Sequence, residues 1–303
     1  MPETAATSHQ NIVSSWTATV ARAMRPAQWL KNGIVFAGLV FGGKLLEASA
    51  VASATLAALA FCLLSSGFYL INDVRDRDAD RLHPAKRMRP IAAGELAPRT
   101  AAVLGVLLIL FAIAASALLS WSLMYVFLAY AGLMAAYNLG LKEIAIIDVF
   151  AIAGGFVLRA VGGAIVVDVS ISPWLLVCTM LLALLIGFGK RRHELVVLND
   201  ARGHRRNLSV YNQAMLDQSV AVSAAGTLIA YAVYTFDSES AQNHHRMMLT
   251  IPFVAYGVFR YPYLLYLGGQ GGAPETMLLT DRPLVAAVAA WATASALLFY
   301  FAG

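Results

Sequence analysis

Charged residues are scarce in this sequence. Asp, Glu, Lys and Arg make up 13% of its 303 residues, whereas 59% are hydrophobic, and the mean hydropathy of +0.68 is far above that of a soluble domain. This composition excludes a water-soluble enzyme. Cysteine is also scarce. Cys62 and Cys178 both lie inside long apolar stretches, so a disulfide framework and a Cys/His metal site are excluded, and both are expected to be packing residues.

Long hydrophobic runs dominate the sequence instead. About 20 apolar residues cross a bilayer as one helix, and the runs do not alternate as the strands of a membrane β-barrel would. The predicted fold class is therefore all-α, a polytopic membrane helical bundle of about nine transmembrane helices. Residues 24–303 are expected to form this single domain, and residues 1–23 a polar N-terminal arm without the features of a signal peptide. The predicted crossings are 30–46, 50–72, 98–119, 121–139, 143–166, 172–189, 214–236, 247–267 and 284–302.

The positive charge is distributed unevenly between the two ends of these crossings. Of the 22 Lys and Arg, 18 fall in connections on the side of the N-terminus, while Lys44 and Arg246 fall on the other side and Arg159 and Arg260 in helices. Because cytoplasmic loops collect positive charge, the N-terminus is predicted to be cytoplasmic. The loops at about 73–97 and 190–213 are then cytoplasmic too, and the active site would face the cytoplasm from an inner (plasma) membrane. No nucleic-acid partner is expected.

A cluster of acids follows the second predicted crossing. Asn72, Asp73, Asp76 and Asp80 are separated by one, three and four residues, so on a helix the three aspartates share one face. Like charges at the end of an apolar bundle repel one another unless a divalent cation lies among them. Oxygen ligands favour Mg²⁺, which completes its shell with water and substrate phosphates. Asp73, Asp76 and Asp80 are therefore the candidate metal ligands, and a solvated charged loop is the alternative.

Three cations follow the acids. Lys86, Arg87 and Arg89 lie within four positions, and Lys and Arg are the side chains that bind phosphate. Acids that bind a metal followed by bases that bind phosphate are typical of a phosphate-ester or diphosphate site. On its own, the basic run could equally be an anchor at lipid headgroups.

The acidic and basic motifs together resemble those of the UbiA superfamily of intramembrane prenyltransferases. They read NDxxDxxxD at a helix end, followed by HPxKRxRPIAAG, and nine crossings also suit that superfamily. Its aromatic prenyltransferases have a second Asp-rich motif on the matching loop of the other half. Here that position reads GKRRHEL at 189–195 and lacks the acids.

The chain is more similar to the decaprenyl-phosphate phosphoribosyltransferase branch. The motifs that carry this likeness are MRPAQWLKN (24–32), YNLGLK (137–142), GFVLRAVGG (155–163), GKRRHEL (189–195), RRNLSVY (205–211) and Asp281-Arg282. The resemblance implies Mg²⁺-dependent transfer of 5-phosphoribosyl from 5-phosphoribosyl 1-diphosphate to a polyprenyl phosphate, which serves the synthesis of lipid-linked arabinose. The alternatives are prenyl transfer from a prenyl diphosphate to an aromatic acceptor and, from another class, a transporter or lipid flippase.

The remaining candidates are polar residues outside the first loop. Lys190 and Arg191 are expected to help bind donor phosphates. Tyr137 and Lys142 could reach a diphosphate or a sugar hydroxyl, or serve as an interfacial aromatic and a snorkelling lysine. Lys31 belongs to an amphipathic segment that either anchors the first crossing or captures the lipid phosphate.

Two ionisable residues lie within the fifth predicted crossing. Asp148 and Arg159 are eleven residues apart, about three helical turns, so each is expected to find a different partner. Arg159 could approach the lipid phosphate or tie helices together. Pairs of small residues such as Gly162-Gly163 permit close helix packing, within one chain or in a homo-oligomer.

Overall fold

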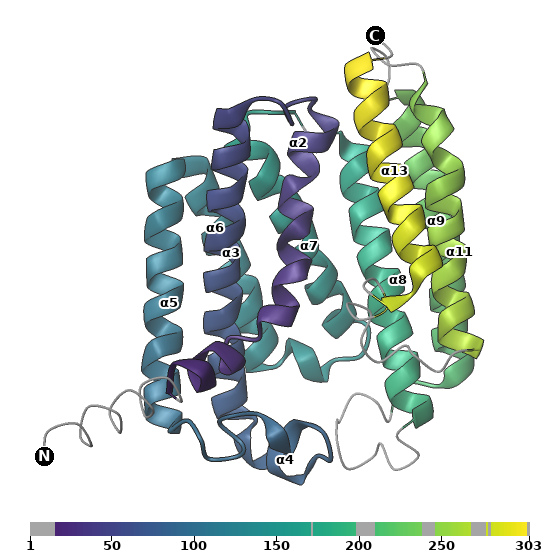
Figure 1. Cartoon of the computed structure of the whole chain (residues 1–303). Helices are drawn as coiled ribbons and strands as arrows, with labels where there is room; N and C mark the ends of the chain where they lie inside the picture. The colour runs from purple at the N-terminus through teal and green to yellow at the C-terminus, as the bar shows by residue number, and fades with distance from the viewer. Residues whose placement is uncertain are drawn as a thin grey trace, which may run out of the picture.

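The computed structural model describes residues 16–170, 172–197, 210–237, 246–267, 277 and 280–301. All regular structure in these ranges is helical, in agreement with the predicted all-α class. Figure 1 shows the helices standing side by side as an upright bundle. The long helices are α3 (Ala48–Arg75), α5 (Pro98–Leu119), α6 (Trp121–Leu139), α7 (Ile147–Val166), α8 (Pro173–Val197), α9 (Gln213–Asp237), α11 (Ile251–Leu267) and α13 (Arg282–Phe301).

Six of these helices, α3, α5, α6, α7, α8 and α9, are long and apolar enough to cross a membrane. They correspond to six of the nine predicted crossings. The last two predicted crossings correspond to α11 and α13, whose described apolar stretches are shorter. The first corresponds to a 3-10 helix of eleven residues, η1 (Pro26–Phe36), and the short helix α2 (Ala37–Phe41) that continues it. The count of nine and the cytoplasmic N-terminus stay predictions.

The bundle consists of two groups of helices. Figure 1 shows α3, α5 and α6 in one group and α8, α9, α11 and α13 in the other, with α7 and the η1–α2 segment between them. One apolar core lies in the first group around Phe61 and Phe127, whose rings are 4.2 Å apart. Another lies in the second group around Leu185 and Leu216. Helix α7 contributes to both groups through contacts with α6 and α8.

Glycines allow close approaches between η1 and α7 and between α3 and α5. A Cβ on Gly163 of α7 would lie 2.0 Å from the carbonyl oxygen of Val35 in η1. A Cβ on Gly67 of α3 would lie 2.6 Å from the carbonyl oxygen of Gly105 in α5. Real side chains cannot approach backbone atoms this closely, so these glycines determine how η1 and α3 pack.

Short elements gather at one end of the bundle, which we call the acidic end because α3 finishes there with its aspartates. They are α4 (Arg77–Leu82), η2 (Lys86–Met88) and η3 (Leu141–Glu143). Figure 1 shows α4 below the lower end of the long helices. The start of α7 lies at this end too, because η3 directly precedes it.

Candidate functional site

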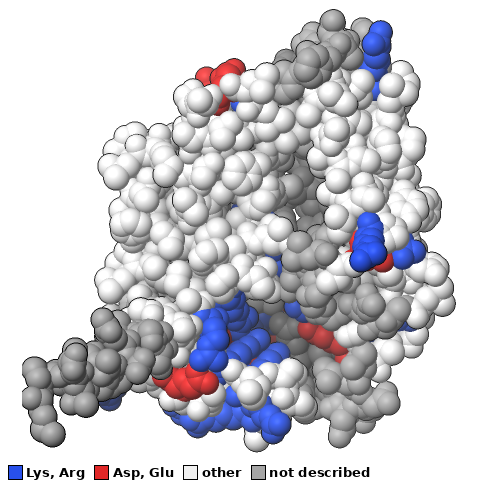
Figure 2. Space-filling view, viewed as in Figure 1, with Lys and Arg blue, Asp and Glu red and all other residues white. Residues whose placement is uncertain are grey.

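The candidate site lies at the acidic end, where segments from distant parts of the sequence meet. Figure 2 shows Lys and Arg side chains gathered at the lower end of the molecule around a hollow, beside acidic side chains, while the rest of this face carries only a few separate charged patches. Side chains from η1, α3, α4, η2 and η3 contribute to the contacts described below. A cluster of opposite charges of this kind is unusual next to a surface as apolar as the rest of the bundle.

Asp73 and Asp80 are held by two arginines. The side chains of Asp73 and Asp80 are 3% and 5% exposed. Arg89, which follows η2, donates to Asp73 Oδ1 at 3.1 Å and to Asp80 Oδ2 at 2.6 Å. Arg25, which immediately precedes η1, forms a second ion pair with Asp73. Two buried carboxylates close together would repel one another, and a shared guanidinium removes that repulsion.

Asp76 and Asn72 are held by a lysine from another part of the chain. Lys142 in η3 donates to both carboxylate oxygens of Asp76, at 2.7 and 3.0 Å, and to Asn72 Oδ1 at 3.2 Å. Its side chain is 13% exposed. Lys142 therefore connects the end of α3 to the turn between α6 and α7.

The spacing predicted that the three aspartates share one helix face. The structure differs, and the backbone explains why. Helix α3 ends at Arg75 and α4 begins at Arg77, so the helix breaks at Asp76, whose N–H still donates to Asn72 O at 2.8 Å. The break directs Asp76 toward Lys142 and leaves Asp73 and Asp80 on Arg89. Asp78 lies outside the cluster and pairs with Arg77 and Arg81.

The donor set fits Mg²⁺ better than any softer metal. Asn72, Asp73, Asp76 and Asp80 offer carboxylate and amide oxygens as ligands, and all four lie around the junction of α3 and α4. In the described part of the chain, no three acids, histidines or cysteines converge on a single point as a ready-made metal cage would require. Mg²⁺ does not need such a cage, because it is commonly bound by one or two carboxylates plus substrate phosphates and water.

The other predicted phosphate ligands differ in their surroundings. Lys86 and Arg87 lie in η2, where Arg87 is exposed. The loop before η2 is ordered by His83, whose Nδ1 accepts from the N–H groups of Ala85 and Lys86 at 3.1 and 3.3 Å. Lys31 donates to Gln28 at 2.5 Å within η1. Neither contact places these cations on the aspartates.

Arg191 is buried in a network of its own. Its side chain is 2% exposed and its Nε donates to Asp148 Oδ2 at 2.6 Å, while Nη1 donates to Glu194 at 2.8 Å. Asp148 also accepts from the hydroxyl of Tyr211 at 2.9 Å, and that hydroxyl accepts from the N–H of Ile146 at 2.5 Å. Burial, together with the nearby Asp148 carboxylate, raises the pKa of Tyr211 to about 12. Tyr211 is therefore neutral at physiological pH and can donate to Asp148.

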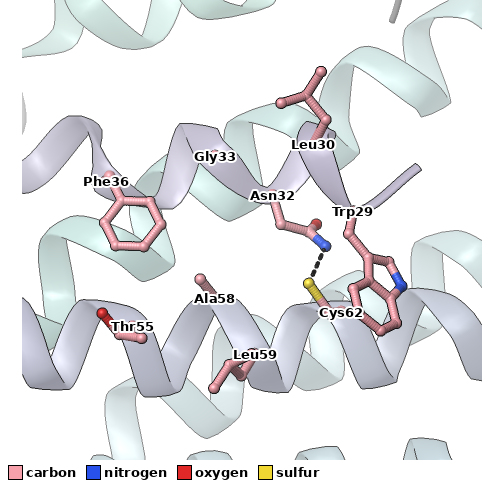
Figure 3. Close-up of a pocket in the computed structure, with 9 residues that line it drawn as sticks. All are labelled: Trp29, Leu30, Asn32, Gly33, Phe36, Thr55, Ala58, Leu59 and Cys62. Atoms are coloured by element: carbon pink, nitrogen blue, oxygen red, sulfur yellow. Dashed lines mark hydrogen bonds between the residues drawn. The ribbon is translucent and has the colours of Figure 1, made fainter. Parts of the chain in front are cut away.

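Arg159 has a different environment, in the middle of α7. It donates to Asn32 Oδ1 at 2.6 Å, to Tyr130 Oη at 2.7 Å and to Gly155 O at 3.0 Å. As expected, Asp148 and Arg159 do not pair with one another. Asn32 in turn donates to Cys62 Sγ at 3.1 Å. Figure 3 shows this contact between η1 and α3, at an apolar pocket of about 240 Å³ that these two elements line.

Sequence reasoning did not include two residues of these networks in the site. Arg25 belongs to the amphipathic segment of the MRPAQWLKN motif, which was expected either to anchor the first crossing or to capture the lipid phosphate, and not to pair with Asp73. Tyr211 also belongs to a motif that carried the resemblance, RRNLSVY, but was not among the candidate site residues. Asp281 pairs with Arg260 at 2.9 Å, in the other half of the bundle. Tyr137 lies near the end of α6 and Lys190 lies within α8, whereas 198–209 and His244-His245 lie outside the described residues.

The fold and site define a class of protein, a helical integral membrane protein with carboxylates and cations gathered at one end of the bundle. Residues 33–279 match the UbiA prenyltransferase family. The chain therefore belongs to that family, as the sequence motifs predicted.

Two curated relatives are similar over most of the chain. One is the decaprenyl-phosphate phosphoribosyltransferase of Mycolicibacterium smegmatis, 33% identical over 306 residues, which cover 96% of this chain and 94% of the relative. The protein of the same name from Mycobacterium tuberculosis is 31% identical, with 90% and 92% covered. Among solved structures, a UbiA homologue from Archaeoglobus fulgidus bound to DMAPP and Mg²⁺ has a TM-score of 0.74 at 18% identity, with 93% and 99% covered. The last comparison confirms the fold.

Proposed function

We propose that the protein transfers the 5-phosphoribosyl group of 5-phosphoribosyl 1-diphosphate to a polyprenyl phosphate of the decaprenyl type and releases diphosphate. The observation that carries the proposal is the pairing of each site carboxylate with a cation, Arg25, Arg89 or Lys142. A diphosphate brought by Mg²⁺ would replace these partners on both sides. The metal would take the carboxylates and the cations would take the phosphate oxygens. The names of the two curated relatives support the same donor and acceptor.

Asp73 and Asp76 are the residues proposed to hold Mg²⁺, with Asn72 and Asp80 beside them. When bound, the ion supplies positive charge that neutralises the diphosphate leaving group. Arg89 and Arg25, on the Asp73 side of the site, would then hold the diphosphate after it leaves the ribose. Lys142 would do the same on the Asp76 side.

The reaction needs little proton chemistry. The bond between ribose C1 and the diphosphate oxygen breaks, and a phosphate oxygen of the lipid forms the new bond to C1 from the opposite face. The electron pair of the broken bond leaves with the diphosphate. Because a phosphate monoester is already an anion at neutral pH, no strong general base is required, and the site acts by positioning the reactants and stabilising charge. We expect the α donor to give a β product.

The proposed orientation places this site on the cytoplasmic side of an inner membrane. The excess of positive charge in the connections at the acidic end supports it, and the soluble donor is then available from the cytoplasm. Lys86, Arg87 and Lys190 are proposed to bind the additional phosphates of the two substrates. The basic GKRRHEL segment, in place of a second acidic motif, suits a donor with two anionic ends better than a prenyl diphosphate with one.

The test is a transfer assay with purified full-length protein in detergent. Radiolabelled 5-phosphoribosyl 1-diphosphate and a short-chain polyprenyl phosphate are mixed with Mg²⁺, and label is followed into the organic phase. Metal-dependent transfer that stops with EDTA is the expected result. Absence of transfer, with activity instead from a prenyl diphosphate and an aromatic acid, would replace the proposal with prenyl transfer.

A further inference from the structure

Arg159 is a buried cation whose described partners are all neutral. It is 5% exposed, in the middle of α7. Within the described ranges only one other arginine is buried to this degree, Arg191, and that one pairs with two carboxylates. The partners of Arg159 are an amide oxygen, a backbone carbonyl and a phenol, with the rings of Tyr130 and Phe156 at 4.7 and 5.5 Å.

This arrangement leaves the guanidinium incompletely satisfied. A guanidinium has five N–H donors, and the three hydrogen bonds use one on each nitrogen. One N–H on each terminal nitrogen therefore has no acceptor among the residues that the structure describes. A cation buried in an apolar bundle without a counter-ion is costly, and apolar side chains of similar size tie helices together at less cost. The missing charge is that of an anion.

The position of Arg159 relative to the carboxylates shows how an anion could reach it. Helical side chains lean toward the N-terminus of their helix, and α7 begins at the acidic end, so the guanidinium leans toward the site. Its partner Tyr130 packs its ring 6.5 Å from Phe68. The next residue, Tyr69, carries the guanidinium of Arg25 over its ring at 5.1 Å, and Arg25 binds Asp73. A series of neighbouring aromatic and charged side chains, with Phe68 and Tyr69 of α3 in its middle, thus leads from Arg159 to the candidate metal ligands.

We infer that Arg159, with Tyr130 and Asn32, forms a subsite that binds a phosphate monoester inside the bundle, deeper than the carboxylates. The inference rests on the proposed function, in which two phosphate monoesters occur: the phosphate of the acceptor lipid and the 5-phosphate of the donor. The acceptor is the expected source. Asn32 also lines the apolar pocket between η1 and α3, so the subsite has an apolar neighbour of the kind an isoprenoid phosphate needs (Figure 3).

The test measures binding without turnover. Purified full-length protein in detergent, without Mg²⁺, is titrated separately with a short-chain polyprenyl phosphate and with ribose 5-phosphate. Three proteins are compared: wild type, Arg159→Gln, and Arg260→Gln as the matched control, which removes an arginine that pairs with Asp281 in the other half of the bundle. Loss of a charged hydrogen-bond partner should weaken binding about 10- to 100-fold. The expected result is that loss for the polyprenyl phosphate in Arg159→Gln only.

The other outcomes are equally decisive. The same loss for ribose 5-phosphate instead would retain the subsite and assign it to the donor. Unchanged binding of both ligands to folded Arg159→Gln, or binding of neither ligand to wild type, would overturn the inference. If Arg159→Gln does not fold, Arg159→Met removes the charge and keeps an apolar side chain of similar length, and wild-type affinity for both ligands in that variant would also overturn it. If wild type binds the polyprenyl phosphate and Arg159→Gln does not, but wild type shows no transfer in the assay above, the subsite is retained and the proposed function is refuted.

Discussion

The buried pair of Asp148 and Arg191 makes a prediction that can be worked out from the structure. The two side chains are 0% and 2% exposed and 2.6 Å apart. Removing one partner of such a pair leaves the other charge buried, which costs about 3–5 kcal/mol. Glu194 remains as a second partner of Arg191 and is 21% exposed. We therefore expect Asp148→Leu to lower the free energy of unfolding by about 3 kcal/mol, at the low end of that range.

A double variant separates the pair from its surroundings. In Asp148→Leu with Arg191→Met, both charges are replaced by apolar groups, and replacements of this kind are often neutral or stabilising. We expect the double variant to recover most of the loss, with a coupling of about 2–3 kcal/mol between the two positions. Asp217→Leu is the matched control. Asp217 pairs with the next residue, Arg192, but its side chain is 35% exposed, so the loss should stay below about 1 kcal/mol.

The assay is reversible unfolding of the purified proteins in mild detergent, followed by tryptophan fluorescence. A cost for Asp148→Leu no larger than that for Asp217→Leu would refute the argument from burial. The same variants test the prediction that Arg191 binds a donor phosphate. If the folded double variant retains transfer, Arg191 has a structural role. If it is stable and inactive, the phosphate role stands.

Four further results are expected. Asp73→Ala and Asp76→Ala should each retain less than about a tenth of the wild-type transfer rate, since removal of a catalytic positioning group typically costs 10²-fold or more; a higher rate in the labelled-transfer assay contradicts the metal assignment. Lys142→Met should lower the transfer rate at least about tenfold with little change in thermal stability, because Asn72 and Asp76 lose the lysine that holds them. A large loss of thermal stability alongside the loss of transfer would point to a purely structural lysine. Gly163→Ala should destabilise the protein by about 1–3 kcal/mol through its contact with Val35, whereas Gly132→Ala, with open space around it, should be neutral or stabilising; equal unfolding curves would refute the close approach. Tyr211→Phe should cost about 1 kcal/mol at pH 8. Because the folded pKa of Tyr211, about 12, lies above the unfolded value near ~10, its contribution is complete below pH 10 and is lost as pH rises toward 12, so the gap between the two proteins should narrow at pH 11.

Hydrophobic length was sufficient to predict most of the long helices, and charge spacing was sufficient to predict which charged groups gather at the acidic end. The runs over 98–119 and 121–139 match α5 and α6 almost residue for residue, because Pro98 and the extended Ser120 interrupt an otherwise continuous apolar sequence. The aspartates, Asn72, Arg89 and Lys142 do lie together. They are close because α3 ends there and because oppositely charged groups pair at the edge of an apolar bundle.

The remaining contacts depend on which helices are neighbours, which spacing cannot predict. Nothing in the sequence around Arg191 indicates that α8 packs its GKRRHEL segment against Asp148, 43 residues earlier. The helix break at Asp76 is equally hidden, because NDVRDRDAD contains neither proline nor glycine. Arg25 reaches Asp73 only because η1 folds back along α3, where Trp29 donates to Ser66 at 3.0 Å.

The 3-10 conformation of η1 changes how far the first segment of the chain can reach. A 3-10 helix rises about 2.0 Å per residue, so its eleven residues extend about 22 Å, and the five residues of α2 add about 7 Å at α-helical rise. These 16 residues thus approach the ~30 Å thickness of a bilayer core, for which an α-helix needs about 20 residues. Rewinding η1 as an α-helix would shorten it by about 5 Å. Such a contraction would draw Arg25 away from Asp73. The 3-10 backbone of η1 therefore sets the distance between the apolar α2 segment and the candidate site at the acidic end.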